Sequence, residues 1–274
     1  MTTRNLFKAA ALASVLALAL TACGGSDEDD SNDKTGTSSP DLSLVKSGTL
    51  TVCSDVPYPP FEDFDQGSEV GFKGFDVDIV SAIAEGLDLK LAIKDSDFDA
   101  LQSGVLLNGR QCDLGASAMT ITDERKENLL FSEGYYDSKQ SLLVPTGSDI
   151  KAIGDLAGKN VGVQRGTTGE AYLKENAPDA NAKQYGDDGK LYLALKAGQI
   201  DAILQDLPVN LDHQNDPKQA GKFTVVETYD TAEKYGFAAK KDNTELMDAV
   251  NEQLQELRDN GEYQKIYDKY FAVS

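Results

Sequence analysis

The chain is poor in histidine, cysteine and basic residues, and each shortage excludes a class of function. Its 274 residues include one histidine, His213, and three cysteines, with no close cluster of the two types. We therefore expect no metal site and no cysteine–histidine catalytic pair. Lysine and arginine number 26 against 46 acidic residues, which gives a formal net charge of −20. Because domains that bind nucleic acid are basic, we expect no nucleic-acid partner.

The one long apolar run lies at the N-terminus and is short for a membrane-spanning helix. Arg4 and Lys8 precede an apolar stretch over residues 9–20, and small residues then lead to Cys23. This pattern predicts a secretion signal over residues 1–22, whose removal would lower the formal charge to −22. The segment Leu20-Thr21-Ala22-Cys23 resembles the lipobox of bacterial lipoproteins, which implies cleavage before Cys23 and lipidation of its sulfur. The alternative is plain secretion with a free thiol.

The next segment contains no apolar side chain. Residues 24–41 read GGSDEDDSNDKTGTSSPD, and such a segment cannot bury enough surface to offset the entropy of ordering. We predict a flexible tether over residues 23–43, followed by the folded part of the chain.

Alternating apolar strands and amphipathic helices predict two α/β units. In the first, strands are expected at 50–53, 89–93 and 114–118, and helices at 76–85 and 98–107. A second run contains strands at 160–164, 200–204 and 223–226, and a last amphipathic helix at 244–258 should return to the first unit. The predicted layout is lobe I over 44–139 and 240–274, lobe II over 145–233, and hinge strands at 140–144 and 234–239. A cleft between lobes is where small ligands commonly bind.

The stretch DLGASAMTITDER, residues 113–125, carries the first indication of function. Thr122 suits a helix N-cap, with Asp123 and Glu124 in the first turn. Arg125 then lies where a cation opposes the helix dipole, which suggests a role beyond folding. Its guanidinium could hold a carboxylate with two hydrogen bonds. The alternative is a surface arginine paired with Glu124 or Glu127.

Two further elements point to the same cleft. Gly166-Thr167-Thr168-Gly169 opens a helix and could offer backbone N–H groups to an anion, although an ordinary helix cap is the simpler reading. It lacks the Gly-Lys-Ser/Thr ending of a nucleotide-binding loop. Asp206 ends a strand, where open α/β sheets expose ligand-binding groups. It could hold an ammonium group or cap the following segment.

Together, Arg125, the helix start and Asp206 are complementary to an amino-acid zwitterion. Tyr58 and Phe98 could supply flat apolar walls for its side chain, or they could simply pack in the core. No cofactor-binding motif stands out.

The chain resembles the family-3 extracellular solute-binding proteins of amino-acid ABC transporters, from about Leu44 to Phe271. The resemblance rests on several motifs in the right order: CSDVPYPPF (53–61), GFDVD (74–78), FDAL (98–101), residues 113–125, DLAGK (155–159), GVQRGTT (162–168), DAILQD (201–206) and GEYQKI (261–266). It implies an α/β, two-lobed, type II periplasmic-binding-protein fold that closes over its ligand.

The resemblance also implies roles for individual residues. It places Arg125 on the ligand α-carboxylate, helped by Thr120 and the backbone near Thr168. It places Asp206 on the α-ammonium, helped by the Thr120 hydroxyl and the Ala118 carbonyl. Relatives often carry serine where Ala118 stands, so a hydroxyl contact would be lost here. The remaining expected contacts are Tyr58 and Phe98 beside the ligand side chain, and Asp55, Gln164 and Gly169 as specificity contacts.

The residues leave a Cys53–Cys112 disulfide plausible in an oxidising compartment, and the resemblance to a disulfide-bridged subset of the family favours it. Asp55 near the side-chain end favours a polar or basic amino acid. The expected protein is a monomer, lipid-anchored on the outer face of the cell membrane, that delivers a free L-amino acid to a membrane permease.

Two other functions remain as alternatives. A dehydratase-like enzyme acting on a small carboxylate could share this fold, but it needs a general acid or base in the cleft. A sensory domain should continue into a membrane helix, whereas this sequence ends at Ser274. We therefore expect a binding protein without catalytic residues.

Overall fold

The computed structural model describes residues 41–272. The predicted signal over residues 1–22, the proposed lipidation site Cys23 and the tether as far as residue 40 lie outside the described residues. Within residues 41–272, no helix has both the length and the apolar character needed to cross a bilayer.

The first lobe is built on a mixed five-stranded sheet with strand order β4-β1-β5-β12-β6. Strand β1 pairs in parallel with β4 and β5, and β12 is antiparallel to β5 and β6. The strands are β1 (Thr49–Ser54), β4 (Lys90–Asp95), β5 (Leu114–Gly115), β6 (Leu129–Phe131) and β12 (Ala238–Lys240). The helices that accompany this sheet are α1 (Phe75–Gly86), α2 (Phe98–Gln102), α3 (Val105–Asn108), α4 (Asp123–Asn128), α8 (Thr244–Asp259) and α9 (Glu262–Phe271). A small hairpin pairs β2 (Asp63–Phe64) with β3 (Phe72–Lys73).

The second lobe is built on another mixed five-stranded sheet, with strand order β11-β7-β10-β8-β9. Strands β8, β9 and β10 run parallel, whereas β7 is antiparallel to both β10 and β11. The strands are β7 (Tyr136–Pro145), β8 (Asn160–Gln164), β9 (Asn181–Tyr185), β10 (Ala202–Asp206) and β11 (Phe223–Tyr235). The helices are α5 (Thr168–Asn176), α6 (Asp188–Lys196) and α7 (Leu207–Asn215), with 3₁₀ turns η1 (Ile153–Leu156) and η2 (Pro217–Gln219). The predicted two-lobed α/β fold is confirmed.

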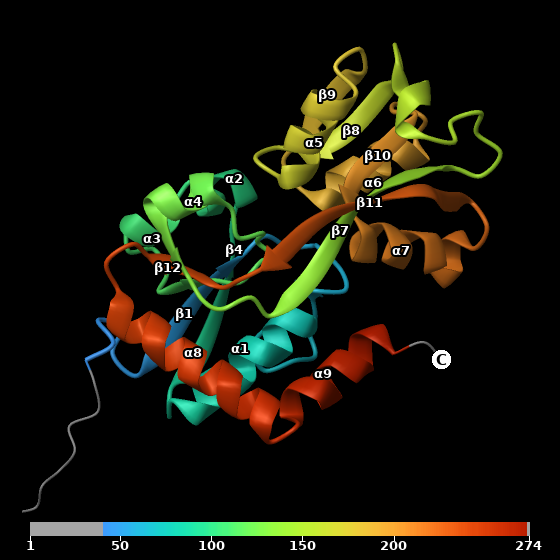
Figure 1. The fold of residues 1–274 in the computed structure, drawn as a ribbon. Helices are drawn as coiled ribbons and strands as arrows, with labels where there is room; N and C mark the ends of the chain where they lie inside the picture. The colour runs from blue at the N-terminus through green and yellow to red at the C-terminus, as the bar shows by residue number, and fades with distance from the viewer. Residues whose placement is uncertain (1–40, 273–274) are drawn as a thin grey trace, which may run out of the picture. The chain divides into compact units, whose positions relative to one another are not determined.

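Apolar periodicity explains the core of the first lobe. All six residues of β1 are buried, as expected for a strand flanked on both edges and covered by helices. Helix α1 buries Ile79 and Ile83 against Val250 and Leu254 of α8 in one apolar cluster, so the last long helix does return to the first lobe (Figure 1). Gly74 precedes α1 with φ +137°, and a Cβ atom there would lie 2.0 Å from the Phe61 carbonyl oxygen, so only glycine fits.

The chain passes between the lobes along β7 and β11. These strands pair with each other through most of their length and belong mainly to the second sheet. At the opposite end, Tyr135 and Tyr235 lie in the apolar core of the first lobe, and Thr120 forms an isolated β-bridge with Tyr235. The two strands therefore carry the chain out of the first lobe and back into it.

Two predicted elements of the first lobe are wrong in part. The helix expected over 98–107 is interrupted, because Gly104 adopts a left-handed conformation with φ +83° and separates α2 from α3. The strand expected over 114–118 ends at Gly115. Beyond it, Ala118 has φ +43°, and its N–H donates to the Asp76 carboxylate at 2.9 Å instead of to a neighbouring strand.

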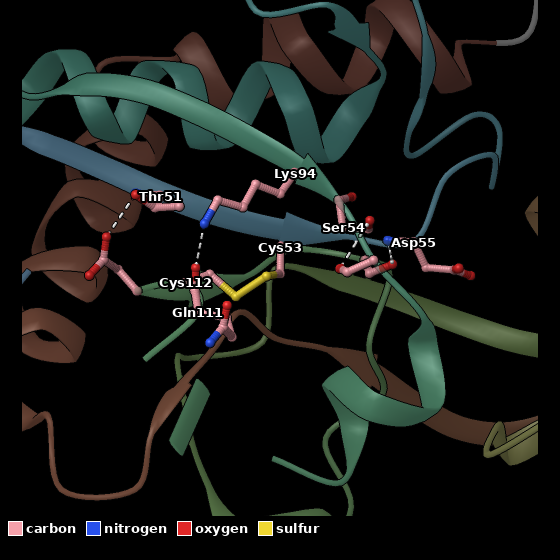
Figure 2. The surroundings of a disulfide bond; sticks show 10 residues. Thr51, Cys53, Ser54, Asp55, Lys94, Gln111 and Cys112 are labelled. Carbon is pink, nitrogen blue, oxygen red and sulfur yellow. Dashed lines mark hydrogen bonds between the residues drawn. A yellow bond between two sulfur atoms is a disulfide. The ribbon is translucent and has the colours of Figure 1, made fainter. Parts of the chain in front are cut away.

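The plausible disulfide is confirmed. Cys53 of β1 and Cys112, just before β5, are bonded, with their Cα atoms 5.8 Å apart. Figure 2 shows the bridge together with the hydrogen bond from Lys94 Nζ of β4 to the Gln111 carbonyl. Thr51 N–H of β1 also donates to Asp113, next to Cys112. The bridge joins two residues that are 59 positions apart in the sequence, and the loop that it closes contains the first βαβ unit.

Removing this bridge is expected to lower stability. The double variant Cys53→Ser/Cys112→Ser should lose about 2–4 kcal/mol of unfolding free energy, because the unfolded chain regains the freedom that a long closed loop had removed. Urea unfolding measures the loss. Reductant should destabilise the wild type by a similar amount and leave the variant unchanged. A wild type insensitive to reductant and equal to the variant would contradict the prediction.

Candidate functional site

A pocket between the two lobes is lined by residues of both. Nine of the ten ligand-binding residues predicted from the sequence line it. Thr167, from the turn expected at the cleft, also lines it, and Ser117 is the lining residue that the sequence reasoning missed. The complete lining is Asp55, Tyr58, Phe98, Ser117, Ala118, Thr120, Arg125, Gln164, Thr167, Thr168 and Asp206. Gly169, the tenth, is not part of this lining. A Cβ atom there would lie 2.9 Å from Gln140 Oε1 and 3.1 Å from the Leu204 carbonyl oxygen, so Gly169 allows α5 to pack closely on β10.

Arg125 lies in the first turn of α4, and its helix starts as predicted. The Thr122 hydroxyl accepts a hydrogen bond from Arg125 N–H at 3.1 Å, an ordinary N-cap. The Arg125 side chain is 5% exposed, so the alternative of a surface ion pair with Glu124 or Glu127 is wrong. Burial lowers the pKa of Arg125 to about 10, an effect that Asp206 and Glu233 oppose. The guanidinium therefore stays charged at neutral pH.

The guanidinium of Arg125 is held mainly by carbonyl oxygens. Nη1 donates to Thr120 O at 2.7 Å, Nη2 donates to Gly166 O at 2.9 Å, and Nε reaches Gln102 Oε1 at 3.4 Å. An arginine has five N–H donors. Each Nη nitrogen therefore keeps one N–H, and two parallel N–H groups match a carboxylate.

Asp206 ends β10 and makes no helix-capping bond through its side chain, so the capping alternative is wrong. Its Oδ2 accepts hydrogen bonds from the hydroxyls of Tyr58 at 2.9 Å and Tyr235 at 2.5 Å, and its Oδ1 accepts one from Gln140 Nε2. Burial, and then the nearby Glu233, raise the pKa of Asp206 to about 7. A cation bound next to Asp206 would stabilise the ionised form of this buried carboxyl group.

The glycine–threonine turn has both of the roles weighed from the sequence. The Thr167 hydroxyl accepts from Glu170 N–H at 3.1 Å and so caps α5. Thr167 and Thr168 also line the cavity, which places the N-terminal end of a nine-residue helix at its wall. The positive end of the helix dipole supports an anion there.

Asp55 and Gln164 meet across the two lobes at another part of the cavity. Gln164 Nε2 donates to Asp55 Oδ2 at 2.5 Å, and Asp55 is 4% exposed. Burial raises the pKa of Asp55 to about 8, the Gln164 hydrogen bond opposes this, and Asp187 adds to it. Asp55 thus brings a second carboxyl group to the lining. Arg165, next to Gln164, is exposed and is not one of the lining residues.

The two predicted aromatic walls have different surroundings. Tyr58 lines the cavity and points its hydroxyl at Asp206. Phe98 lines the cavity and belongs to the apolar cluster that contains the disulfide cysteines. The centroid of its ring lies 5.2 Å from Arg125 Cζ. Phe98 therefore packs in the core and also holds the guanidinium by a cation–π contact.

Three buried carboxyl groups behind the cavity were missed. Glu62 accepts from the Ser117 hydroxyl at 2.6 Å, and that hydroxyl oxygen in turn accepts from Asp55 N–H. Asp76 accepts from Ala118 N–H and from the Tyr135 hydroxyl at 2.7 Å. Glu233 contacts Thr120 and Gln140. Acidic residues are ordinarily exposed, so no pattern in the sequence marked these three as buried.

The lining has an unequal balance of charge. Among the described residues that line the cavity, Arg125 is the one cation, while Asp55 and Asp206 are carboxyl groups. The matching ligand has one anionic and two cationic groups. No group of three or more His, Cys, Asp or Glu side chains in residues 41–272 is arranged to hold a metal ion.

Comparisons with known proteins agree with this geometry. Residues 50–273 match the family described as bacterial extracellular solute-binding proteins, family 3. The chain is 34% identical to a probable histidine-binding protein of Neisseria gonorrhoeae over 268 residues, which covers 96% of this chain and 94% of that protein. It is 35% identical to an arginine-binding periplasmic protein of Mannheimia haemolytica over 225 residues, 81% of this chain and 90% of that protein.

A solved structure has the same fold. An ancestral arginine-binding protein bound to arginine aligns with a TM-score of 0.77 at 36% identity, and the alignment covers 82% of this chain and 99% of that one.

Proposed function

Because the chain belongs to the bacterial extracellular solute-binding proteins, family 3, we propose that it captures a free basic L-amino acid outside the cytoplasm. It is the binding component of an ABC importer and hands the ligand to a membrane permease. The named relatives are a probable histidine-binding protein and an arginine-binding protein, and a structure of the same fold contains arginine.

The observation that carries the choice of a basic side chain is the charge of the cavity lining. Arg125 supplies one positive group, whereas Asp55 and Asp206 supply two acidic groups. A free amino acid with a cationic side chain carries one carboxylate and two cationic groups, so each charge finds an opposite partner. An acidic amino acid would bring a second carboxylate into a lining that has no second cation to balance it, which is unfavourable in a desolvated site.

The proposed roles follow the geometry. The free N–H groups of Arg125 hold the α-carboxylate, with Thr120 and the α5 backbone at Thr168 beside it. Asp206 holds the α-ammonium, with the Ala118 carbonyl as a further acceptor. Asp55 holds the cationic end of the side chain, Gln164 stands opposite it, and Tyr58 and Phe98 flank the aliphatic part. Gly169 acts through the close packing of α5.

We propose the following boundaries for the two lobes and the hinge. Lobe I comprises residues 44–139 and 240–274, lobe II comprises 145–233, and residues 140–144 and 234–239 are the hinge strands. Support comes from β7 and β11, which belong to the second sheet and whose ends at Tyr136 and Tyr235 pack on the core of the first lobe. The hydrogen bonds of Tyr58 to Asp206 and of Gln164 to Asp55 join the lobes at the cavity. Bending of the hinge strands would break these contacts and admit the ligand.

We also propose that the protein is a lipoprotein anchored through Cys23 to the outer face of the cell membrane, and that it acts as a monomer. The signal-like start and the Leu-Thr-Ala-Cys sequence support the anchor. Several lipid chains on one cysteine would hold a protein firmly on a bilayer.

An enzyme was the alternative on the same fold. The named relatives are binding proteins, and this chain is likewise a binding protein rather than an enzyme. The raised pKa values of Asp55 and Asp206 are explained by burial and by the nearby acidic residues Asp187 and Glu233, and they need no catalytic role.

A thermal-shift screen of the common L-amino acids tests the proposed function. L-arginine, L-lysine or L-histidine should give the largest rise in unfolding temperature, since a ligand at 100 times its Kd stabilises the native state by about 2.7 kcal/mol. L-aspartate and L-glutamate should give none. Calorimetry on the strongest ligand gives the affinity. A shift for the acidic amino acids alone, or for no amino acid, would contradict the proposal.

A further inference from the structure

Strand β11 departs from regular pairing just before Glu233. Tyr229 pairs with Gln140 and Glu233 pairs with Ser138, so four steps along β11 match two along β7. Within this bulge Ala232 has φ +51°, a conformation that non-glycine residues seldom adopt. Bulges redirect side chains and are common beside functional sites. Strained backbone of this kind is found most often beside functional sites.

The bulge places the Glu233 carboxyl behind the ammonium end of the cavity. Glu233 is 9% exposed and is not one of the lining residues. Its Oε2 accepts from the Thr120 hydroxyl at 3.3 Å and from Gln140 Nε2 at 3.0 Å. Gln140 Nε2 also donates to Asp206. One carboxyl group therefore contacts Thr120 directly and Asp206 through a single intervening amide.

The contact with Thr120 fixes what that residue can offer a ligand. A hydroxyl has one hydrogen to donate and two lone pairs that accept. An ionised Glu233 can only accept, so the Thr120 hydroxyl is the donor in their 3.3 Å contact and is left with lone pairs for the cavity. Asp206 is likewise an acceptor when ionised. The two side chains then select a group rich in N–H donors, such as an ammonium, over a hydroxyl or a methylene.

We propose that Glu233 is the positioning residue that makes this end of the cavity specific for an α-ammonium group. It acts by orienting the Thr120 hydroxyl as an acceptor and, through Gln140, by holding the Asp206 carboxylate in place. This rests on the proposed function, because it assumes that the cavity holds an amino acid.

Glu233 also sets the pH range of binding. The groups that face Asp206 are the hydroxyls of Tyr58 and Tyr235, the Gln140 amide, the Arg125 guanidinium and Glu233. Burial and Glu233 raise the pKa of Asp206 to about 7. A protonated Asp206 cannot balance an ammonium charge, so affinity should fall as the pH drops through that value. Neutralising Glu233 should lower the pKa of Asp206 and move the fall to lower pH.

The test compares wild type with Glu233→Gln by calorimetry between pH 6 and pH 8.5. The probes are L-arginine and 5-guanidinopentanoic acid, which is arginine without its α-ammonium group. At pH 8.5 the variant should bind L-arginine about 10-fold or more weakly, the effect of a hydrogen bond to a charged group. It should bind the des-amino acid about as well as wild type does. The deficit for L-arginine should shrink toward pH 6.

Two further variants keep the test decisive. Glu227→Gln is the matched control, because Glu227 lies on the same strand and accepts from Ile153 N–H and the Tyr229 hydroxyl. It should leave both affinities unchanged. Thr120→Val removes the oriented hydroxyl but keeps the side-chain shape. If the two residues act together, the double variant should lose less affinity for L-arginine than the product of the two single fold-losses. Thermal unfolding without ligand shows which variants are folded. If Thr120→Val is not folded, the comparison of Glu233→Gln with Glu227→Gln still tests the proposal.

The possible results separate the two proposals. If wild type binds no amino acid, the proposed function is wrong. If wild type binds L-lysine in place of L-arginine, the same comparison is made with L-lysine and 6-aminohexanoic acid. If wild type binds and Glu233→Gln matches it, or loses both probes equally with no change in pH profile, the role of Glu233 is wrong and the proposed function stands.

Discussion

Replacement of Arg125 by alanine is expected to weaken the binding of L-arginine by about 100-fold or more. The guanidinium keeps one free N–H on each Nη nitrogen after its bonds to Thr120 O and Gly166 O. Each hydrogen bond to a charged group contributes about 1.5–3 kcal/mol, and the two parallel bonds to a carboxylate would be lost together. Isothermal calorimetry with L-arginine measures the loss.

The fold should tolerate this change. Burial lowers the pKa of Arg125, which means that the buried charge is not fully compensated in the ligand-free protein, and its removal relieves that burden. The unfolding temperature without ligand should therefore stay close to that of wild type. Arg165→Ala is the matched control, because Arg165 is an exposed arginine on the neighbouring lobe, and it should keep full affinity. Unchanged binding in Arg125→Ala would remove this residue from the ligand site.

Replacement of Asp206 by asparagine is expected to weaken the binding of L-arginine by about 30- to 5,000-fold. Truncating one partner of a buried charge pair commonly costs 2–5 kcal/mol. The asparagine amide would also direct a donor at hydroxyl or amide groups that now donate to Asp206. The loss should be largest for ligands with an α-ammonium group. Competition calorimetry with L-arginine and 5-guanidinopentanoic acid measures both losses.

The ratio of the two losses decides whether the ammonium contact is correct. The des-amino acid should lose about 3-fold at most, since it places no cation beside Asp206 and feels only the altered hydrogen bonds. Asp201→Asn, at an exposed position just before β10, should change neither affinity. Equal losses for both ligands would show that Asp206 supports the cavity without contacting the ammonium group.

Strong periodicity made much of the fold predictable. Strand β1 and helices α1 and α8 combine long apolar patterns with clear ends, and the structure has them within one or two residues of the prediction. Local patterns could not reveal where pairing stops. Ala118 leaves the strand because a distant carboxyl group, Asp76, takes its N–H. Edge strand β9 is mostly exposed, so it shows no apolar signal at all.

The candidate site was predictable where a residue opposed its local preference. Arg125 stood out because a cation in the first turn of a helix is unfavourable, and Asp206 because it ended a buried strand. Glu62, Asp76 and Glu233 gave no such signal, since an acidic residue in a sequence this acidic is expected on the surface. Their burial depends on contacts between segments far apart, such as Glu62 with Ser117 and Glu233 with Thr120.

The strand order of the first sheet has a consequence for how the chain reaches its native state. Strand β12, from near the C-terminal end, lies between β5 and β6, and α8 completes the core beneath α1. The last strand of the second sheet ends at Tyr235, and the inner strand of the first sheet follows at once over Ala238–Lys240. Both sheets therefore depend on segments from the last quarter of the chain. A truncation before α8 would leave the first lobe without the helix that covers α1.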